Sequence, residues 1–586
     1  MILAQIRRLM RQEALDAYVI PMGDPHHNEY LAPHWQLIKA VSGFSGSAGV
    51  LLITQDFAGL WTDARYFGQA EYEIEAYGLE LVRLQVPHQP EYIDWLEQHL
   101  TRAARIGGDL ALFSIQAWQS LHARLEAASL ELVPLDEFWT HYWLDRPAKS
   151  SAEIFVHPDK YVGEKRSAKL HKLKTALQKS PANACLLTAL DEIAWLLNLR
   201  GADIPYNPIF FSFFWLSAER SVLFVELAKI GEELKETLRI AGVECLPYTA
   251  IHEYVAEQRE PLIWSDPRSL NAALYGTLAP QNWLLNPSYI RTAKANKHPE
   301  ECALIRARHD KEGLVWLYAW QWWEQQLQEN AVGELDLVNY MESLRAEEEV
   351  YLGPSFSPIV AYGPNGAMNH YSPSKENQAM IEQGSLLLVD TGGQYLDGTT
   401  DMTRTFATGT PTESQRKAYT AVLQGLIALS RLRFPAGTAG QQLDSLARAA
   451  LWQEGLNYGH GTGHGVGYCL NVHEGPQAIG TGASGDKAAR LEQGMLTSVE
   501  PGYYLEGQWG IRVENLLLCV EDEKAGWLKF ESLGYCPLEV KLIVWEQLKD
   551  AEWEWVRDFQ KSVYRGYEKR ILPHLKPWLQ EKTFAK

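Results

Sequence analysis

Two hydrophobic patterns alternate along the first half of the chain. Short apolar runs are typical of buried strands, and longer segments with apolar residues at helical spacing predict the helices that cover them. The runs lie at residues 17–20, 50–53, 184–187 and 221–225, and the helical segments lie at residues 1–12, 92–104, 115–128 and 164–179. This alternation predicts α/β structure for residues 1–298.

The pattern breaks at Pro147, and Ser150 and Ser151 follow it, which is typical of a linker. A chain of 586 residues is also too long for one hydrophobic core. We therefore expect one α/β domain over residues 1–147 and a second over residues 148–298.

A third domain is expected over residues 299–586. It opens at residues 300–328, where Leu and Trp recur at helical spacing and predict one long helix. Thr412 and Gln415 match a capping box, which predicts the start of another helix that ends near Leu432. The tail after residue 545 is rich in Trp and is also predicted to be helical.

Two aspartates of this third domain lie at the ends of predicted strands. Residues 386–389 form an apolar run that Asp390 ends, and a Gly-Gly turn follows. Residues 402–406 are predicted to form a second strand, which Asp401 precedes. A hairpin of these two strands would direct both carboxylates toward one point.

Two glutamates and one histidine follow in a similar setting. Residues 496–499 form a predicted strand that delivers Glu500, and a proline stops that strand. Arg512 and Glu514 share one face of a further predicted strand, because side chains repeat every two residues. His464 stands in a glycine-rich loop.

Such a set of side chains favours a metal centre. A single carboxylate at the end of a strand is normally a solvated cap, but five ligand-type residues occur here in order, beside glycine or proline. Four carboxylates that converge in a dry site repel one another unless cations neutralise them. Oxygen ligands with one imidazole favour manganese over a thiolate-type zinc site, and two such ions can activate water and polarise a carbonyl.

The amino-acid composition limits which binding partners and which cellular compartment are expected. The chain has 54 Lys and Arg against 73 Asp and Glu, a net charge of −19, and no basic stripe, which argues against a nucleic-acid partner. Its six cysteines are scattered without a C-x-x-C pair, as is typical of reduced thiols in the cytoplasm. Cys469 lies near His464 and could be a ligand or a nucleophile, but a buried thiol is the better interpretation. Residues 1–12 lack the apolar region of a signal peptide, and no apolar window is long enough for a membrane span.

Several motifs of other functions are absent or incomplete. The glycine loop at residues 43–49 lacks the Gly-Lys-Ser/Thr of a phosphate-binding loop. Residues 480–485 match G-x-G-x-x-G but follow no clear strand, so we expect a mobile loop there. The chain has no G-x-S-x-G elbow and no H-E-x-x-H helix, which excludes the usual serine-hydrolase and zincin patterns.

The ordered set Asp390, Asp401, His464, Glu500 and Glu514 resembles the pita-bread metallopeptidases, a family that includes methionine aminopeptidase, prolidase and aminopeptidase P. Four longer phrases are similar to the long-chain, three-domain Xaa-Pro aminopeptidases of the cytosolic aminopeptidase P type. They are GFSGSAG at 43–49, WTDARYF at 61–67, DGTTDMTRT at 397–405 and NVHEGP at 471–476. This resemblance runs nearly end to end. It implies α/β and α+β structure, with two creatinase-like domains before a pita-bread catalytic domain.

By resemblance, the expected enzyme is a dimetal exopeptidase that removes the residue ahead of a proline at the second position of a peptide. Asp390 would hold one ion, His464 and Glu500 would hold the other, and Asp401 and Glu514 would bridge both. A hydroxide between the ions would attack the scissile carbonyl. Glu500 would carry the proton from that water to the leaving nitrogen.

Other residues match family positions by their spacing. His370 and His473 are assigned to the carbonyl and the tetrahedral intermediate, and His460 to substrate positioning. Arg512 is expected to orient a ligand carboxylate. Residues 468–472 form an apolar step that is expected to carry His473 along a strand. The family often forms homodimers, and a homodimer is expected here.

Two alternatives remain open. A prolidase-type dipeptidase would share the five ligands, but the two large N-terminal domains and the HEGP phrase at 473–476 favour aminopeptidase P. A non-catalytic binding module on the same fold, as in some histone chaperones, would lose the ligands and carry an acidic tail. Here the ligands are present and the acidic tail is missing.

Overall fold

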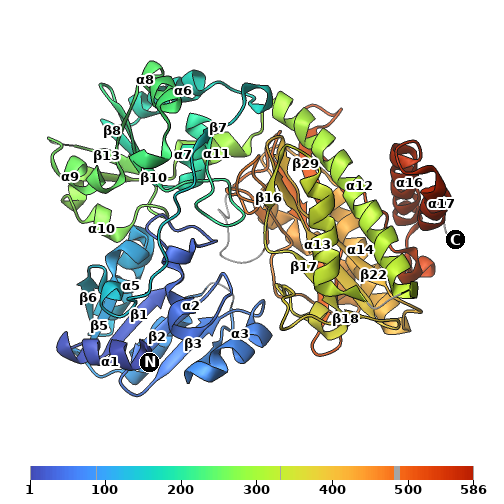
Figure 1. Ribbon diagram of the computed structural model, residues 1–586, viewed down its shortest axis with the longest axis horizontal. Coiled ribbons are helices and arrows are strands. Elements are labelled where there is room, and N and C mark those ends of the chain that lie inside the picture. The colour runs from blue at the N-terminus through green and yellow to red at the C-terminus, as the bar shows by residue number, and fades with distance from the viewer. Residues whose placement is uncertain (1, 87–88, 260, 330–331, 481–488, 585–586) are drawn as a thin grey trace. The chain divides into compact units, whose positions relative to one another are not determined.

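The computed structural model describes residues 2–86, 89–259, 261–329, 332–480 and 489–584 (Figure 1). It forms two compact units, Met1–Lys294 and Ala295–Lys586. Within the described ranges, no helix has both the length and the apolar character that crossing a membrane requires. The expectation of a loop at residues 480–485 falls almost wholly on residues 481–488, outside the described ranges, and stays a prediction.

The N-terminal unit begins with a six-stranded mixed sheet in the order β4-β3-β2-β1-β5-β6. The strands are β1 (Ala17–Pro21), β2 (Val50–Thr54), β3 (Ala58–Thr62), β4 (Glu80–Arg83), β5 (Arg105–Asp109) and β6 (Glu131–Leu135). The helices are α1 (Ile2–Gln12), α2 (Leu37–Ser42), α3 (Phe67–Ile74), α4 (Glu91–His99) and α5 (Ile115–Ala127). The short apolar runs therefore became the central strands, and the expected helices flank them in sequence.

A second sheet in the same unit has the order β12-β11-β10-β8-β13-β14. Its strands are β8 (Ala184–Leu187), β10 (Ser212–Ser217), β11 (Ser221–Val225), β12 (Val243–Pro247), β13 (Ile263–Ser265) and β14 (Trp283–Leu285). Its helices are α6 (Arg166–Lys179), α7 (Leu190–Leu197), α8 (Glu232–Ile240), α9 (Ile251–Ala256), α10 (Ala272–Tyr275) and α11 (Tyr289–Ala295).

The two sheets have the same topology. In each, the first strand pairs antiparallel with the second, and the second pairs antiparallel with the third. The third strand pairs parallel with the fourth, and the first strand also begins a parallel run on its other side. The shared fold that the family resemblance implied is thus present, although no sequence repeat reveals it.

The C-terminal unit contains small sheets beside long helices (Figure 1). The strands that build the site are β17 (Ile359–Tyr362), β19 (Leu386–Thr391), β22 (Met402–Ala407), β24 (Gly463–His464), β25 (Ala478–Ile479), β26 (Leu496–Val499), β27 (Gly502–Leu505), β28 (Trp509–Arg512), β29 (Asn515–Glu521) and β30 (Trp527–Ser532). The helices are α12 (Pro299–Glu329), α13 (Glu334–Ala346), α14 (Glu413–Ser430), α15 (Asp444–Gln453), α16 (Asp550–Tyr567) and α17 (Lys576–Phe584).

Strand β19 shows how the core orients the site. Leu387 and Val389 pack in one hydrophobic cluster with Trp316 and Trp320 of α12. Leu388 instead packs with residues of β17, on the opposite face of the strand. Because side chains alternate along a strand, Asp390 lies on the same face as Leu388 and away from α12.

Most of the expected elements in this unit are confirmed. Helix α12 covers the predicted long helix, and the Thr412 side chain caps α14 by accepting from the Gln415 backbone N–H. Two expectations are wrong. Glu514 is not part of a strand, because the chain leaves the ladder between β28 and β29. Residues 468–472 form bends instead of a strand. The domain boundaries near residues 147 and 298 stay predictions.

Candidate metal centre

The two aspartates of the centre are set by the pairing of β19 with β22. Asp390 lies opposite Thr403 in this antiparallel pair, and Asp401 immediately precedes β22. The connecting segment returns very close to its start, because a Cβ on Gly392 would lie 1.9 Å from the carbonyl oxygen of Thr400. Only glycine fits at this turn, and the turn holds the two carboxylates on one side of the hairpin.

Glu514 reaches the same place from the break between β28 and β29. Its backbone N–H donates to the carbonyl oxygen of Thr403 at 3.1 Å. The Thr403 hydroxyl in turn donates to Glu514 Oε2 at 2.8 Å. Glu514 is therefore attached twice to β22, and its side chain is only 1% exposed.

Glu500 and His464 come from neighbouring segments. Glu500 directly follows β26, and its backbone N–H donates to the carbonyl oxygen of Thr462 at 2.8 Å. The His464 backbone N–H donates to the Ser498 hydroxyl at 3.0 Å. Here too the approach is close, since a Cβ on Gly463 would lie 1.8 Å from the Ser498 carbonyl oxygen.

These residues converge on one point. Ligand-type atoms of Asp401, His464 and Glu514 all lie within 4.8 Å of one another, a spacing that suits a metal ion. His464 Nε2 lies 3.5 Å from Asp401 Oδ2 and 3.5 Å from Glu500 Oε1. His464 Nδ1 lies 3.0 Å from the Gly465 carbonyl oxygen, a contact that favours a proton on Nδ1 and leaves Nε2 as the ligand atom.

Divalent cations fit this donor set. Asp390 Oδ1 and Glu514 Oε1 are buried and have no hydrogen-bond partner among the described residues. A buried carboxylate oxygen without a partner is costly, and a cation supplies the missing interaction. The remaining donors are oxygens and a single imidazole, which suits a hard divalent ion.

The electrostatics lead to the same conclusion. Burial raises the pKa of Asp390 to about 7, although Arg512 partly opposes the shift. Burial, followed by the neighbouring carboxylates, raises the pKa of Glu514 well above its usual value. Burial alone would lower the pKa of His464, but Asp401 and Glu500 raise it to about 9. Without metal ions, these side chains therefore tend to keep their protons, and bound cations would replace those protons.

Arg512 and Tyr504 connect Asp390 with His460. Arg512 donates to Asp390 Oδ2 from Nε at 3.2 Å and from a terminal nitrogen at 2.5 Å. Its other terminal nitrogen donates to the Tyr504 hydroxyl at 2.8 Å. That hydroxyl lies 2.9 Å from His460 Nε2. Arg512 therefore contacts a candidate ligand directly, whereas His460 lies two hydrogen bonds farther out.

The structure brings His473 to His464, and it brings the backbone next to His370 to Arg512. The rings of His464 and His473 are 4.4 Å apart at an interplanar angle of 86°. His370 is half-buried, and the carbonyl oxygen of the preceding Asn369 accepts from Arg512 at 3.5 Å. Cys469 is fully buried, in agreement with its interpretation as a structural thiol.

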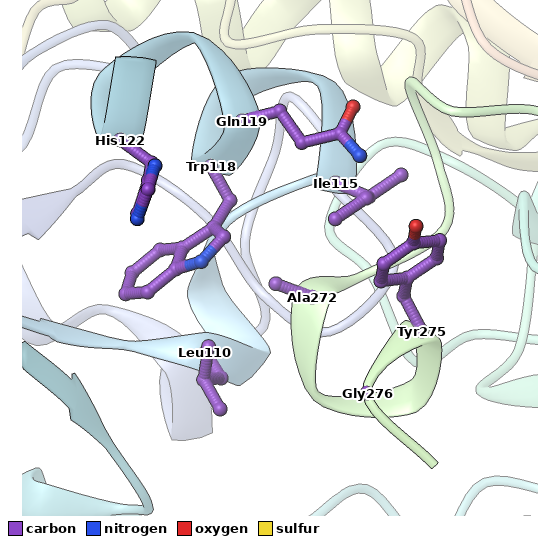
Figure 2. Close-up of a pocket in the computed structure, with 8 residues that line it drawn as sticks. All are labelled: Leu110, Ile115, Trp118, Gln119, His122, Ala272, Tyr275 and Gly276. Carbon is purple, nitrogen blue, oxygen red and sulfur yellow. The ribbon is translucent and has the colours of Figure 1, made fainter. Parts of the chain in front are cut away.

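Figure 2 shows a pocket elsewhere, in the N-terminal unit. It has a volume of about 280 Å³ and is lined by Leu110, Ile115, Trp118, Gln119, His122, Ala272, Tyr275 and Gly276. The lining is mainly apolar and contains no carboxylate. It therefore offers no cluster of carboxylate ligands for a metal ion, and the metal centre remains the candidate site.

Three polar residues of the site received no role from the sequence. Thr403 holds Glu514, Ser498 holds the His464 backbone, and Tyr504 joins Arg512 to His460. Thr403 and Ser498 act through partners distant in sequence, and the two partners of Tyr504 lie 44 and 8 positions away, so no one spacing gives a signal. Only its position at the edge of a ligand-bearing strand could have pointed to Thr403.

Comparison with known proteins agrees with this architecture. Residues 305–521 match the model of metallopeptidase family M24, and residues 526–585 match the C-terminal region of that peptidase family. Residues 2–141 and 145–301 each match the creatinase/prolidase N-terminal domain. The chain belongs to metallopeptidase family M24.

Among relatives, a probable Xaa-Pro aminopeptidase P of Laccaria bicolor is 37% identical over 96% of this chain and 89% of that protein. Aminopeptidase P2 of Arabidopsis thaliana is 35% identical over 96% of this chain and 85% of that protein. The X-prolyl aminopeptidase of Caenorhabditis elegans, a cytosolic enzyme with a di-nuclear active site, has a TM-score of 0.94 at 31% identity, and the match covers 100% of this chain and 99% of that one.

Proposed function

We propose that this chain is an Xaa-Pro aminopeptidase, which hydrolyses the bond between the first residue of a peptide and a proline at the second position. The observation that carries the proposal is the buried cluster of Asp401, His464 and Glu514, together with carboxylate oxygens that have no hydrogen-bond partner among the described residues. It is found in a chain similar over its whole length to Xaa-Pro aminopeptidases. Two divalent cations bound there would supply an activated water and polarise the scissile carbonyl.

The side chains take distinct roles in this proposal. Asp401 and Glu514 would hold both ions, Asp390 would hold one, and His464 and Glu500 would hold the other. The position of Glu500 supports a proton-transfer role, because its side chain is 20% exposed and can meet both water and substrate. The depth of Glu514, 1% exposed, suits a purely ligating role.

Other side chains bind and orient the substrate. His473 lies against His464 and, together with His370, donates to the oxygen on which negative charge develops. His460 positions the substrate from its contact with Tyr504. Arg512 fixes the orientation of Asp390 through its two donated hydrogen bonds.

Three further properties belong to the same proposal. Manganese is the expected ion, because the donors are oxygens with one imidazole. A cytoplasmic location is supported by the cytosolic enzyme of Caenorhabditis elegans. A homodimer is supported by apolar surface on α15, where Leu446 and Trp452 are 42% and 51% exposed. Light scattering that gave a particle with the mass of one chain would contradict the homodimer.

Mass spectrometry of peptide products tests the activity. The protein is stripped with a chelator and then incubated with Arg-Pro-Pro, Ala-Ala and Gly-Pro peptides, with and without added manganese. We expect manganese-dependent release of the first residue from Arg-Pro-Pro and little product from Ala-Ala. Cleavage of Gly-Pro alone would identify a prolidase-type dipeptidase instead, and metal-dependent turnover of none of the peptides would contradict the proposal.

A further inference from the structure

A completely buried ion pair contacts the segment that carries His464 and His473. Lys297 Nζ lies 2.8 Å from Glu474 Oε1, and the two side chains are 0% and 1% exposed. Burying two charges is costly unless the geometry and the hydrogen bonds compensate for the lost water, so such a pair is weak evidence for stability alone. Its position suggests a more specific role.

The segment that carries His464 and His473 runs out from His464 and returns through His473. Lys297 contacts both the outgoing and the returning limb. Its Nζ also donates to the Val466 carbonyl oxygen at 2.6 Å, on the limb that begins with His464. Its partner Glu474 directly follows His473 on the returning limb. The Glu474 backbone N–H donates to the Gly465 carbonyl oxygen at 2.8 Å, which joins the limbs beside the two imidazoles.

Lys297 is itself held firmly. It lies just before α12, and its backbone N–H donates to the Gly494 carbonyl oxygen at 3.1 Å. Its own carbonyl oxygen accepts from the Cys302 thiol at 3.6 Å. The ammonium group therefore extends from a fixed point of the fold into an irregular segment. The ends of this segment pair as β24 and β25, and its outgoing limb also bridges to Thr497 at Gly465.

We propose that Lys297 is a positioning residue for the metal centre: paired with Glu474, it fixes the two limbs so that His464 and His473 keep their separation. One imidazole then stays aimed at the ions while the other faces the substrate. This inference rests on the roles proposed above for the two histidines. It predicts that the loss of Lys297 weakens the ion held by His464 and slows turnover, although Lys297 touches neither metal nor substrate.

The test compares Lys297→Met, Glu474→Gln and the double variant Lys297→Met/Glu474→Gln with the wild type. The double variant buries no unpaired charge. Its melting temperature should therefore be closer to the wild-type value than the melting temperature of Lys297→Met is. Titration calorimetry measures the affinity for the second Mn²⁺, the ion that His464 is proposed to hold. In the double variant this affinity should still fall about 10–100-fold. Its kcat should fall by a similar factor with KM little changed. Glu474→Gln keeps an acceptor for Nζ and the contact with Val466, so its loss of affinity should be smaller.

A matched control comes from the same unit. Lys582 and Glu324 form another mostly buried pair, 2.6 Å apart, between α17 and α12. Lys582→Met should lower the melting temperature, yet it should bind two Mn²⁺ ions with wild-type affinity and keep the wild-type kcat. Equal losses of second-ion affinity in this control and in Lys297→Met would show a general effect of destabilisation and would overturn the proposal.

A double variant with wild-type second-ion affinity and kcat would also overturn it, because the pair would then serve stability alone. If neither methionine variant at Lys297 folds, Glu474→Gln decides, since wild-type second-ion affinity in that variant contradicts the proposal. The wild type separates this question from the proposed function. Failure of the wild type to bind two Mn²⁺ ions or to cleave Arg-Pro-Pro removes the function itself, whereas normal wild-type behaviour with unaffected variants removes only the role of Lys297.

Discussion

The metal centre has an acidic half and an imidazole half, and the two are built differently. Asp390 belongs to a paired strand, and Asp401 and Glu514 are fixed to the ends of paired strands by backbone hydrogen bonds or tight turns. His460 and His473 lie on irregular segments, and the strand that holds His464 is only two residues long. The acidic half is therefore oriented by the register of long strands, whereas the imidazole half depends on a two-residue strand pairing, an isolated bridge at Gly465 and individual hydrogen bonds.

This difference predicts different consequences when each half is changed. Loss of a bridging carboxylate removes charge from the middle of the site and should empty it. Loss of an imidazole that faces the substrate should leave the ions in place. The changes that follow are ordered from the largest expected effect to the smallest.

Replacement of a bridging carboxylate should have the largest effect. We expect Glu514→Ala and Asp401→Ala to lose both metal ions and all measurable peptidase activity, because each side chain is proposed to contact both ions. Elemental analysis after dialysis, beside peptide hydrolysis, measures the two losses together. Glu506→Ala, an exposed position on the β27–β28 hairpin, is the control and should behave as wild type. Two ions retained in Glu514→Ala would refute the bridging role.

Replacement of the substrate-facing histidines should come next. His473→Ala and His370→Ala should keep both ions and the fold but lose about 10²–10³ in kcat, or roughly 2.7–4 kcal/mol, as expected for a lost transition-state hydrogen bond. Steady-state kinetics with saturating manganese measures this. His574→Ala, an exposed histidine of the same unit, should leave kcat unchanged. A wild-type kcat in both active-site variants would mean that His473 and His370 are not the residues that contact the substrate.

A change at Arg512 should have an intermediate effect. Lysine keeps the positive charge but cannot donate to Asp390 from two nitrogens of a rigid plane and still reach Tyr504. Arg512→Lys should therefore lower manganese affinity or activity by about 10–100-fold. Tyr504→Phe removes only the hydroxyl contact and should lose less. A greater loss in Tyr504→Phe than in Arg512→Lys would mean that Tyr504, and not the Asp390 contact, is the critical link.

The effect of pH on stability should be the smallest and the most gradual. Without metal, folded Asp390 keeps its proton up to about pH 7, whereas the unfolded chain releases it near 3.8. Because the folded state binds more protons in this window, stability without metal falls as the pH rises through it. His464, with its pKa raised to about 9, continues the fall from pH 6.5 upward.

Metal-bound ligands carry no such protons, so manganese should stabilise the protein more as the pH rises. The difference in melting temperature with and without manganese should therefore widen from about pH 4 to pH 7, and activity should decline below about pH 6 as protons compete with the ions. Calorimetry across this range measures the difference. A difference that stays constant with pH would mean that the buried carboxylates do not bind the ions.

The same contrast explains what the sequence could predict. Strands that end in Asp390 and Glu500 were recognisable, because a continuous apolar run followed by a carboxylate is a local signal. The paths of the histidine segments were not, and the strand expected at residues 468–472 is absent. Glu514 was expected on a strand but lies in a break that the hydrogen bond to Thr403 defines. Contacts such as Lys297 with Glu474 join residues far apart in the chain, and no local pattern reveals them.

Counting metal ions in two histidine variants tests the central claim most directly. His464 is proposed to ligate an ion and His473 to contact only the substrate, although their rings are 4.4 Å apart. Elemental analysis of dialysed His464→Ala and His473→Ala, beside their kcat values, separates the roles. The account predicts two ions and low turnover in His473→Ala, and a lost ion that high manganese partly restores in His464→Ala. A metal-free His473→Ala beside a His464→Ala that keeps two ions would contradict it.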